Sequence, residues 1–81
     1  IDQVNFNFGS FENISDRKWV EKRSNGSIAF RFNEQNRTNS AILLFDESRS
    51  VHISLIIPAN EILYSHKGEQ FRTLYKITHV Q

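Results

Sequence analysis

Apolar and polar side chains alternate along residues 27–33, and an Asn25-Gly26 pair stands directly before that run. Such a pair favours a tight turn between two strands, because asparagine tolerates and glycine freely adopts the positive φ angles that the turn needs. In a strand, a period of two places every second side chain on one face, which here holds Ile28, Phe30 and Phe32. The pattern therefore predicts a β-hairpin, and with it an antiparallel β protein.

The same alternation recurs between turn-forming residues along the chain and predicts about seven short strands. These cover residues 4–8, 17–24, 27–34, 40–46, 50–57, 61–65 and 71–78. The polar stretch 9–16 is predicted as the longest loop, with one short helical turn within 10–19 as the alternative. No segment sustains the three- and four-residue apolar spacing of a helix. We therefore expect an all-β fold of one domain, residues 1–81, in an up-and-down antiparallel meander curled into a small barrel or a two-sheet sandwich.

Most aromatic side chains fall on strand faces that we expect to point into the core, where each buried ring contributes about 1.5–3 kcal/mol. They are Phe6, Phe8, Phe30, Phe32, Phe45, Phe71 and Tyr75. Trp19 shares a strand side with Arg17, Glu21 and Arg23, whereas Val20 lies opposite. We interpret Trp19 as pointing inward. In the alternative, Val20 points inward and an exposed indole stands among charged groups, as in a protein-recognition or sugar-stacking surface.

Composition and charge further limit the fold and the possible functions of the chain. A chain of 81 residues builds one core and buries only about 60% of the surface that its unfolded form exposes. The net charge is +1, so no overall field steers the domain toward nucleic acid or an acidic membrane. The absence of cysteine excludes disulfides and thiolate chemistry and leaves the redox compartment open. No apolar run approaches the roughly 20 residues of a membrane helix, so no membrane insertion is expected.

The beginning of the chain and its glycosylation motifs leave the source compartment open. The chain starts at Ile1 without a charged-then-apolar leader, which indicates a mature form, a domain excised from a longer protein or an expression fragment. Acceptor sequences for N-glycosylation start at Asn13, Asn25 and Asn36, all in predicted turns. Secreted and intracellular locations are both compatible with these features.

A meander places successive turns at alternate ends of its sheet. One end is predicted to be rich in amide groups and carries Asn13, Asp16, Asn36, Arg37, Asn39 and Asn60. The other is predicted to be charged and carries Asn25, Glu47, Ser48, Arg49, His66, Lys67 and Glu69. Asp46 and Arg49 are expected to form a turn pair, in which Asp46 accepts backbone N–H groups and a salt bridge. Turn chemistry alone explains many asparagines, whereas the functional interpretation is that short amides on a rigid scaffold suit hydroxyl-rich ligands.

Catalytic and metal-binding patterns are weak. His52 and Ser54 share the solvent side of one strand, but no acidic residue in that strand completes a triad. The three histidines lack the close spacing that is typical of zinc sites. We therefore expect no enzyme, no cofactor and no metal.

The predicted function is a non-enzymatic binding module, with carbohydrate as the first ligand class. The alternatives are a protein interaction or oligomerisation domain of a larger protein and, further, a weak single-stranded nucleic-acid binder built on the basic residues around Trp19. The candidate ligand-binding residues are Trp19, Arg17, Glu21, Arg23, Asn13, Asn36, Arg37, Asn39 and Asn60.

Overall fold

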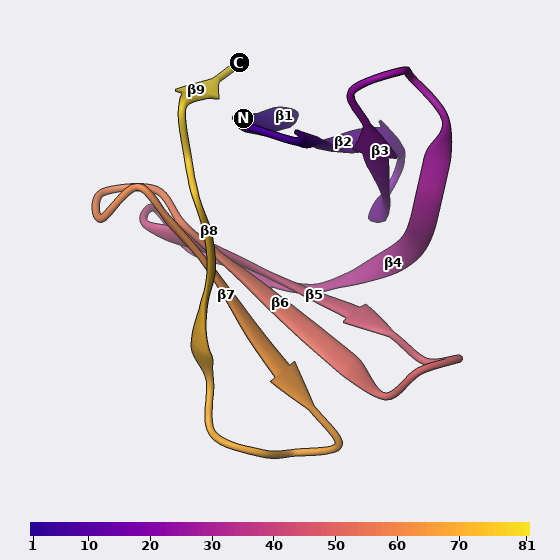
Figure 1. The fold of residues 1–81 in the computed structure, drawn as a ribbon. Coiled ribbons are helices and arrows are strands. Elements are labelled where there is room, and N and C mark those ends of the chain that lie inside the picture. The colour runs from indigo at the N-terminus through magenta and orange to yellow at the C-terminus, as the bar shows by residue number, and fades with distance from the viewer.

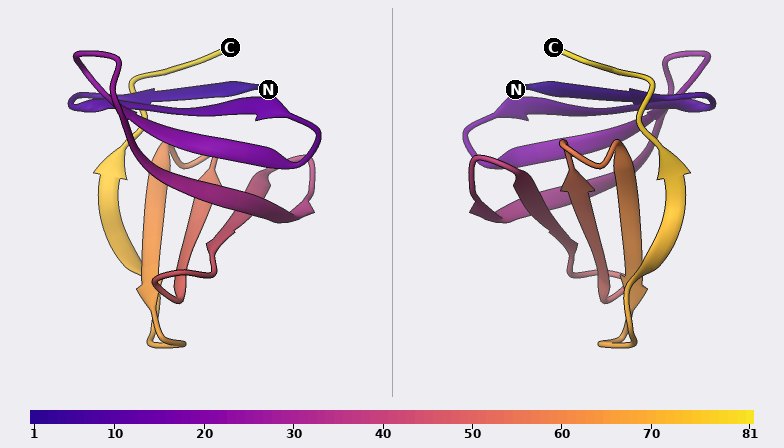
Figure 2. Two further views of the ribbon diagram at one scale, coloured as in Figure 1. Left: turned by 90° about the vertical axis from the view of Figure 1, so that its right-hand side faces the viewer. Right: turned by 90° about the vertical axis from the view of Figure 1, so that its left-hand side faces the viewer.

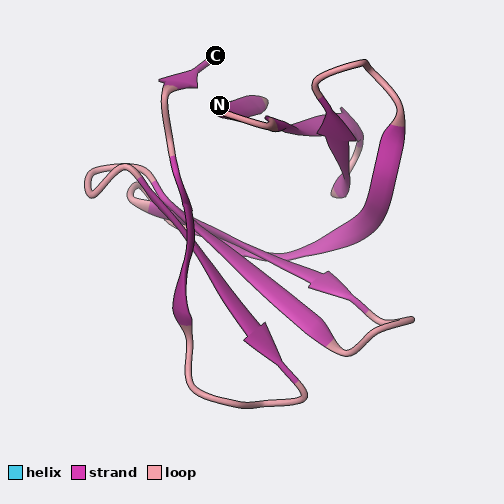
Figure 3. Cartoon of the chain, in the orientation of Figure 1, coloured by secondary structure: helices cyan, strands magenta, loops and turns pink.

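The computed structural model describes residues 1–81 as strands and turns, without a helix (Figure 1, Figure 3). The strands are β1 (Gln3–Phe6), β2 (Gly9–Ser15), β3 (Lys18–Arg23), β4 (Ile28–Arg37), β5 (Ala41–Asp46), β6 (Val51–Ile56), β7 (Glu61–His66), β8 (Arg72–Lys76) and β9 (His79–Val80). They form one antiparallel sheet in the order β8-β7-β6-β5-β4-β3-β2-β1-β9. The expected all-β meander is confirmed, with nine strands instead of about seven. No helix is long and apolar enough to span a membrane.

The sheet curls so that its first half covers its second half. Figure 2 shows β1 to β4 running across β5 to β8, and β4, the longest strand, bends from one layer into the other. The pairing of β4 with β5 shifts register between Glu34 and Asn36, and such irregularities bend a strand. The curl encloses the inward faces of both layers and produces the incomplete barrel seen in Figure 1.

The last residues of the chain connect the two edges of the sheet. The chain leaves β8 through Ile77 and Thr78 and then pairs as β9 with β1. The Thr78 N–H donates to the Asn5 carbonyl at 2.8 Å, while the Ile77 N–H donates to the Asn60 carbonyl at 2.8 Å. The single strand predicted over 71–78 is therefore wrong in its bounds, because the bend at Ile77 divides it into β8 and β9 and leaves the predicted strand's first residue in a turn.

The predicted loop over 9–16 is also wrong, because these residues form β2. Its large apolar residues, Phe11 and Ile14, do not alternate, and the adjacent residues Ser10 and Phe11 are both buried. Residues 9–15 form a strand because their backbone pairs with β1 on one side and with β3 on the other, which the sequence of this segment alone does not predict. Gly9 permits this pairing, since a Cβ there would lie 1.9 Å from the Lys22 carbonyl oxygen. The alternative helical turn within 10–19 is excluded by the same strand.

The hairpin predicted around Asn25-Gly26 is confirmed, but its turn is not the expected one. Only Gly26 has a positive φ, of 89°. The Asn25 Oδ1 instead accepts hydrogen bonds from the Ser27 N–H at 2.9 Å and from the Ser27 hydroxyl at 2.7 Å. The side chain of Asn25 thus stabilises a wider turn over residues 24–27, as asparagine commonly does, and the β3–β4 register shifts between Glu21 and Lys22.

The core consists of twelve apolar side chains that face the interior of the curl. They are Val4, Phe6, Phe11, Trp19, Phe32, Ile42, Leu44, Val51, Ile53, Leu55, Ile62 and Ile77. The inward orientation of Trp19 is confirmed, since only 1% of its surface is exposed. Val20 is buried as well, outside this cluster, so burial of Val20 does not require an exposed Trp19.

Several aromatic side chains that the sequence assigned to the core are exposed. Phe8 is 70% exposed because it lies in the β1–β2 turn instead of the strand predicted over 4–8. Phe30 and Ile28 belong to β4 but lie near its beginning, where the curl opens, and are 37% and 41% exposed. Phe71 precedes β8 and is 40% exposed. A period of two gives the side of a regular strand. It shows neither where a register shift changes that side, as it does between Phe30 and Ile28, nor where the strand leaves the core.

Candidate functional site

The turns gather at two ends of the curled sheet, as the meander predicts. The β2–β3, β4–β5 and β6–β7 turns define one end, called here the amide end. The remaining hairpin turns define the other, called the charged end. Asp16, Asn39 and Asn60 do lie in turns of the amide end, whereas Asn13 lies within β2 and Asn36 within β4.

The amide end is sealed by a network around Trp19. The indole Nε1–H donates to Oε1 of Glu34 at 2.9 Å, and Nη2 of Arg37 approaches the same oxygen at 3.0 Å. The Arg37 guanidinium lies 6.0 Å from the centre of the indole ring. The hydrogen bond from Arg37, opposed by burial and aided by Trp19, holds the pKa of the Glu34 carboxyl below its usual value. Glu34 therefore remains ionised and fixes both partners in place.

Beside this network lies an open polar hollow of about 560 Å³. It is lined by Asp2, Asn13, Ile14, Ser15, Asp16, Arg17, Glu34 and Arg37. Arg17, at φ 58° in the β2–β3 turn, donates to the carbonyls of Glu34 and Gln35. The Oδ1 atom of Asn13 is buried and has no hydrogen-bond partner. A buried acceptor without a partner is costly in free energy.

At the charged end, the predicted Asp46–Arg49 turn pair is confirmed. Asp46 accepts hydrogen bonds from the Ser48 N–H at 3.0 Å, from the Ser48 hydroxyl at 2.6 Å and from Nε of Arg49. Burial opposes ionisation of Asp46, but these bonds together hold the pKa of its carboxyl below the usual value. The Arg49 guanidinium then lies 3.4 Å from the ring centre of Phe30 and 5.7 Å from that of Phe32.

Next to Arg49, the charged end opens into a small depression that we call the mouth pocket. Its volume is about 180 Å³, and it is lined by Glu21, Phe30, Arg49, Val51, Ile53, Tyr64, Leu74 and Tyr75. Burial raises the pKa of the Glu21 carboxyl, although Arg49 and Arg23 oppose the shift, and no hydrogen bond contributes to it. Burial and the charge of Glu21 also raise the pKa of Tyr75. Glu21 is thus a half-buried carboxylate without a hydrogen-bonded partner.

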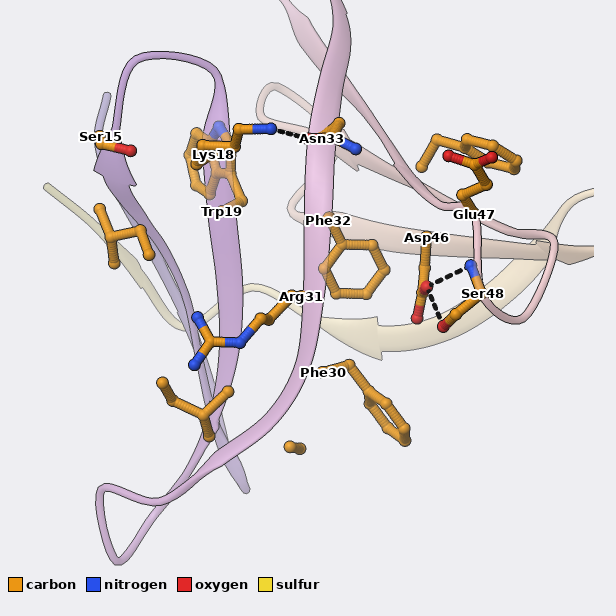
Figure 4. A pocket seen from close by; sticks show the side chains of 14 residues that line it. Ser15, Lys18, Trp19, Phe30, Arg31, Phe32, Asn33, Asp46, Glu47 and Ser48 are labelled. Carbon is orange, nitrogen blue, oxygen red and sulfur yellow. Dashed lines mark hydrogen bonds between the residues drawn. The ribbon is translucent and has the colours of Figure 1, made fainter.

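A larger groove of about 760 Å³ follows β4 and shares Phe30 with the mouth pocket (Figure 4). Figure 4 shows Lys18 and Arg31 on one side of β4, and the Asp46–Ser48 turn on the other. Three exposed apolar side chains also line the groove, namely Ile14, Ile28 and Phe30, with exposed fractions of 52%, 41% and 37%. We call this depression the β4 groove.

The nine predicted site residues do not form one site. Asn13, Arg17 and Arg37 meet at the polar hollow, Glu21 lies in the mouth pocket, and Trp19 lines the β4 groove from the core. Arg23 lines a separate polar depression over β1, β2 and β3. Asn36, Asn39 and Asn60 are exposed and line none of these depressions. The alternative in which Trp19 is an exposed indole is wrong, and with it the stacking surface expected for a sugar or a base.

Sequence reasoning missed the apolar side chains of the β4 groove and the Glu34–Arg37 pair. Ile28 and Phe30 were assigned to the core, and Ile14 was assigned to a loop. The Glu34–Arg37 pair has the same three-residue spacing as Asp46–Arg49, which was the available signal. That spacing alone does not reveal the third partner, Trp19, which comes from another strand.

The histidines show no catalytic arrangement. His52 stacks on Phe45 with ring centres 4.5 Å apart and lies 3.2 Å from Oε1 of Gln35. It is half-buried instead of exposed, because Phe71 also covers it at 6.4 Å. No group of three or more histidine, aspartate or glutamate side chains is placed to hold a metal ion. No protein-family model, curated protein or solved structure matches this chain, so the argument for function rests on the geometry of its surface depressions.

Proposed function

We propose that the protein is a non-enzymatic binding module whose β4 groove takes an extended segment of a protein partner. The observation that carries this proposal is that the lining of the groove includes three large apolar side chains that are exposed, Ile14, Ile28 and Phe30. Large apolar side chains gathered in one depression commonly mark an interaction site, whereas single exposed ones need no explanation.

Charge along the groove supports a peptide occupant. Arg31 lies on one side and Glu47 on the other, and neither takes part in any of the four salt bridges of the chain. Two unpaired charges of opposite sign can orient a partner segment and fix its register. Residues 28–32 of β4 pair with β3 only, because the pairing with β5 begins at Asn33. The other backbone edge of this segment can therefore accept main-chain hydrogen bonds from an extended peptide. A segment with an apolar centre flanked by an acidic and a basic residue fits this arrangement.

The proposal is tested by selecting a random displayed peptide library on the immobilised domain. Peptides that bind the wild type should weaken about tenfold, equivalent to about 1.4 kcal/mol, against Ile28→Ser. The matched control is Phe71→Ser, which removes a side chain of similar exposure, 40% against 41%, away from the groove. The proposal is wrong if selection enriches no peptide, or if enriched peptides bind Ile28→Ser and the wild type equally.

A saccharide is the second candidate, and the predominantly polar lining of the hollow, which includes Asn13, favours it. The hollow combines carboxylate and amide acceptors with the donors Arg17 and Arg37, a set that suits hydroxyl groups. A glycan array probed with the wild type, with Asn13→Ala and with Asn36→Ala as the exposed control tests this candidate. Binding that is lost only in Asn13→Ala supports it. If the array shows no binding, or binding that Asn13→Ala does not change, the saccharide candidate is wrong.

A further inference from the structure

We propose that the mouth pocket binds an alkylammonium group, with Glu21 as the counter-charge and the apolar wall beside it receiving the alkyl chain. This site is distinct from the segment-binding part of the β4 groove, although both share Phe30. The ammonium group can belong to a small free amine or to the lysine side chain of a partner, since both present the same chemistry.

The charged groups that face the pocket leave Glu21 without a hydrogen-bonded cation. Arg49 carries the nearest positive charge, but its Nε is hydrogen-bonded to Asp46 and its guanidinium covers Phe30. Arg23 acts on Glu21 through charge alone and donates its own hydrogen bond to Ser27. The charges of Asp46, Glu21, Arg49 and Arg23 sum to zero, but neither arginine donates a hydrogen bond to Glu21. A carboxylate held in partly apolar surroundings is stabilised by a hydrogen-bonded cation.

The wall of the pocket fits an amphipathic cation better than a metal ion or a sugar. Val51, Ile53 and Leu74 supply an aliphatic surface, while Tyr64 and Tyr75 add aromatic rings. Arg72 lies 5.5 Å from the ring centre of Tyr64, and Arg49 lies over Phe30, so cations already pack on two rings of this pocket. Aromatic walls with a nearby anion are a known way of binding organic ammonium groups.

The size of the pocket selects a small head group. Its volume of about 180 Å³ lies below the range of about 300–1,000 Å³ that holds drug-sized ligands. Leu74 is 40% exposed and Phe30 is 37% exposed, so the pocket is open to solvent on their side. A linear alkyl chain that ends in an ammonium group can enter there without displacing a strand.

The experiment is an NMR titration of the intact chain with n-butylammonium chloride, observing the Glu21 side-chain carboxyl carbon and the tyrosine rings. We expect saturable shifts, a lower pKa of Glu21 in the bound state, and affinity reduced about tenfold or more in Glu21→Gln. Sodium chloride at equal ionic strength and n-butanol test whether charge or chain alone produces the shifts. Equal shifts with either of them, or equal affinity in Glu21→Gln, would overturn the proposal.

Two further measurements complete the test. One distinguishes this site from the neighbouring β4 groove, and the other distinguishes a free amine from a lysine side chain as the source of the ammonium group. Ile28→Ser should leave n-butylammonium binding unchanged, so failure of the segment-binding proposal is distinguishable from failure of this one. Glu12→Gln, which breaks the surface salt bridge to Lys22, is the matched control for removal of a carboxylate. A capped Gly-Lys-Gly peptide compared with capped Gly-Ala-Gly then shows whether a lysine side chain enters the pocket, as opposed to a free amine only.

Discussion

The two ends of the curled sheet use the same pair of residues for different purposes. At the amide end, Glu34 binds Arg37 three residues later, and the arginine lies against Trp19. At the charged end, Asp46 binds Arg49 with the same spacing, and that arginine lies on Phe30. The indole of Trp19 donates a hydrogen bond to the acid, whereas a phenylalanine ring has no polar group to donate. The aromatic residue therefore takes part in the first hydrogen-bond network, whereas Ser48 completes the second and leaves the Phe30 ring outside it.

The difference decides which end is free to bind. Sealing the amide end buries Trp19 completely and leaves only a polar hollow beside it. The charged end keeps Phe30 partly exposed and leaves Glu21 without a hydrogen-bonded partner. An acid–arginine pair near a turn is thus not evidence of a site in itself. What matters is whether its aromatic neighbour completes the hydrogen-bond network.

The largest expected contrast between the ends is in their aromatic residues. Trp19→Ala should reduce the free energy of unfolding by about 3–5 kcal/mol, because it leaves a cavity in the core. Phe30→Ala should cost only about 1 kcal/mol, less than full burial of the ring predicts, because the ring is 37% exposed. Urea unfolding of both variants, with Phe32→Ala as a buried control, measures the difference. Equal losses at Trp19 and Phe30 would show that the two ends are packed alike.

The next contrast concerns the acid that seals the amide end. Glu34→Ala should cost about 1–3 kcal/mol, because it leaves the buried indole N–H without an acceptor and Arg37 without a partner. Glu34→Gln keeps a carbonyl oxygen for the indole and should lose less. Chemical unfolding together with the fluorescence spectrum of Trp19 checks both variants. A loss as small as that of an exposed ion pair, below about 1 kcal/mol, would contradict the sealing role.

Acidification should affect Glu34 and Asp46, one at each end, in the same direction and Glu21 in the opposite direction. Glu34 and Asp46 have lowered pKa values, so the stability that they contribute is present above their unfolded pKa values and lost as the pH falls through the folded ones. Glu21 has a raised pKa, so its contribution is present at low pH and lost as the pH rises through its folded value. Urea unfolding between about pH 7 and about pH 3 should show that Glu34→Gln flattens the acid-side loss. An unchanged pH profile in this variant would contradict the lowered pKa of Glu34.

The smallest expected effect is a gain in stability at the mouth pocket. Glu21→Gln should raise the melting temperature at neutral pH, because it removes a half-buried charge that has no hydrogen-bonded partner. The control Glu12→Gln should change stability by no more than about 0.5 kcal/mol, since its salt bridge is partly exposed. Thermal unfolding of both variants measures the two changes in stability. A loss of stability in Glu21→Gln would mean that Glu21 holds the charged end together.

The spacing of residues in the sequence correctly predicted those structural features that depend only on residues close together in the chain. The alternation in β6 correctly placed Val51, Ile53 and Leu55 in the core. The spacing of Asp46 and Arg49 correctly predicted their salt bridge, because the partners lie three residues apart around one turn. The regular spacing of turn signals predicted an antiparallel meander with alternating ends, although it missed β2 and the division between β8 and β9.

The sequence by itself determined the all-β class, the sides of the regular strands and the charge of the two ends. Only the tertiary structure decided which inward side chains are covered, since that depends on where the curled layers overlap. Curling buries Trp19. The pairing of β3 with β4 places Glu34, fifteen residues away in the sequence, beside its indole. The same curling leaves Phe30, on the strand next to Trp19, at an open mouth. In a small barrel, the burial of a side chain depends on the face of the strand to which it points and on its position along the strand. A period of two indicates the face but not the position.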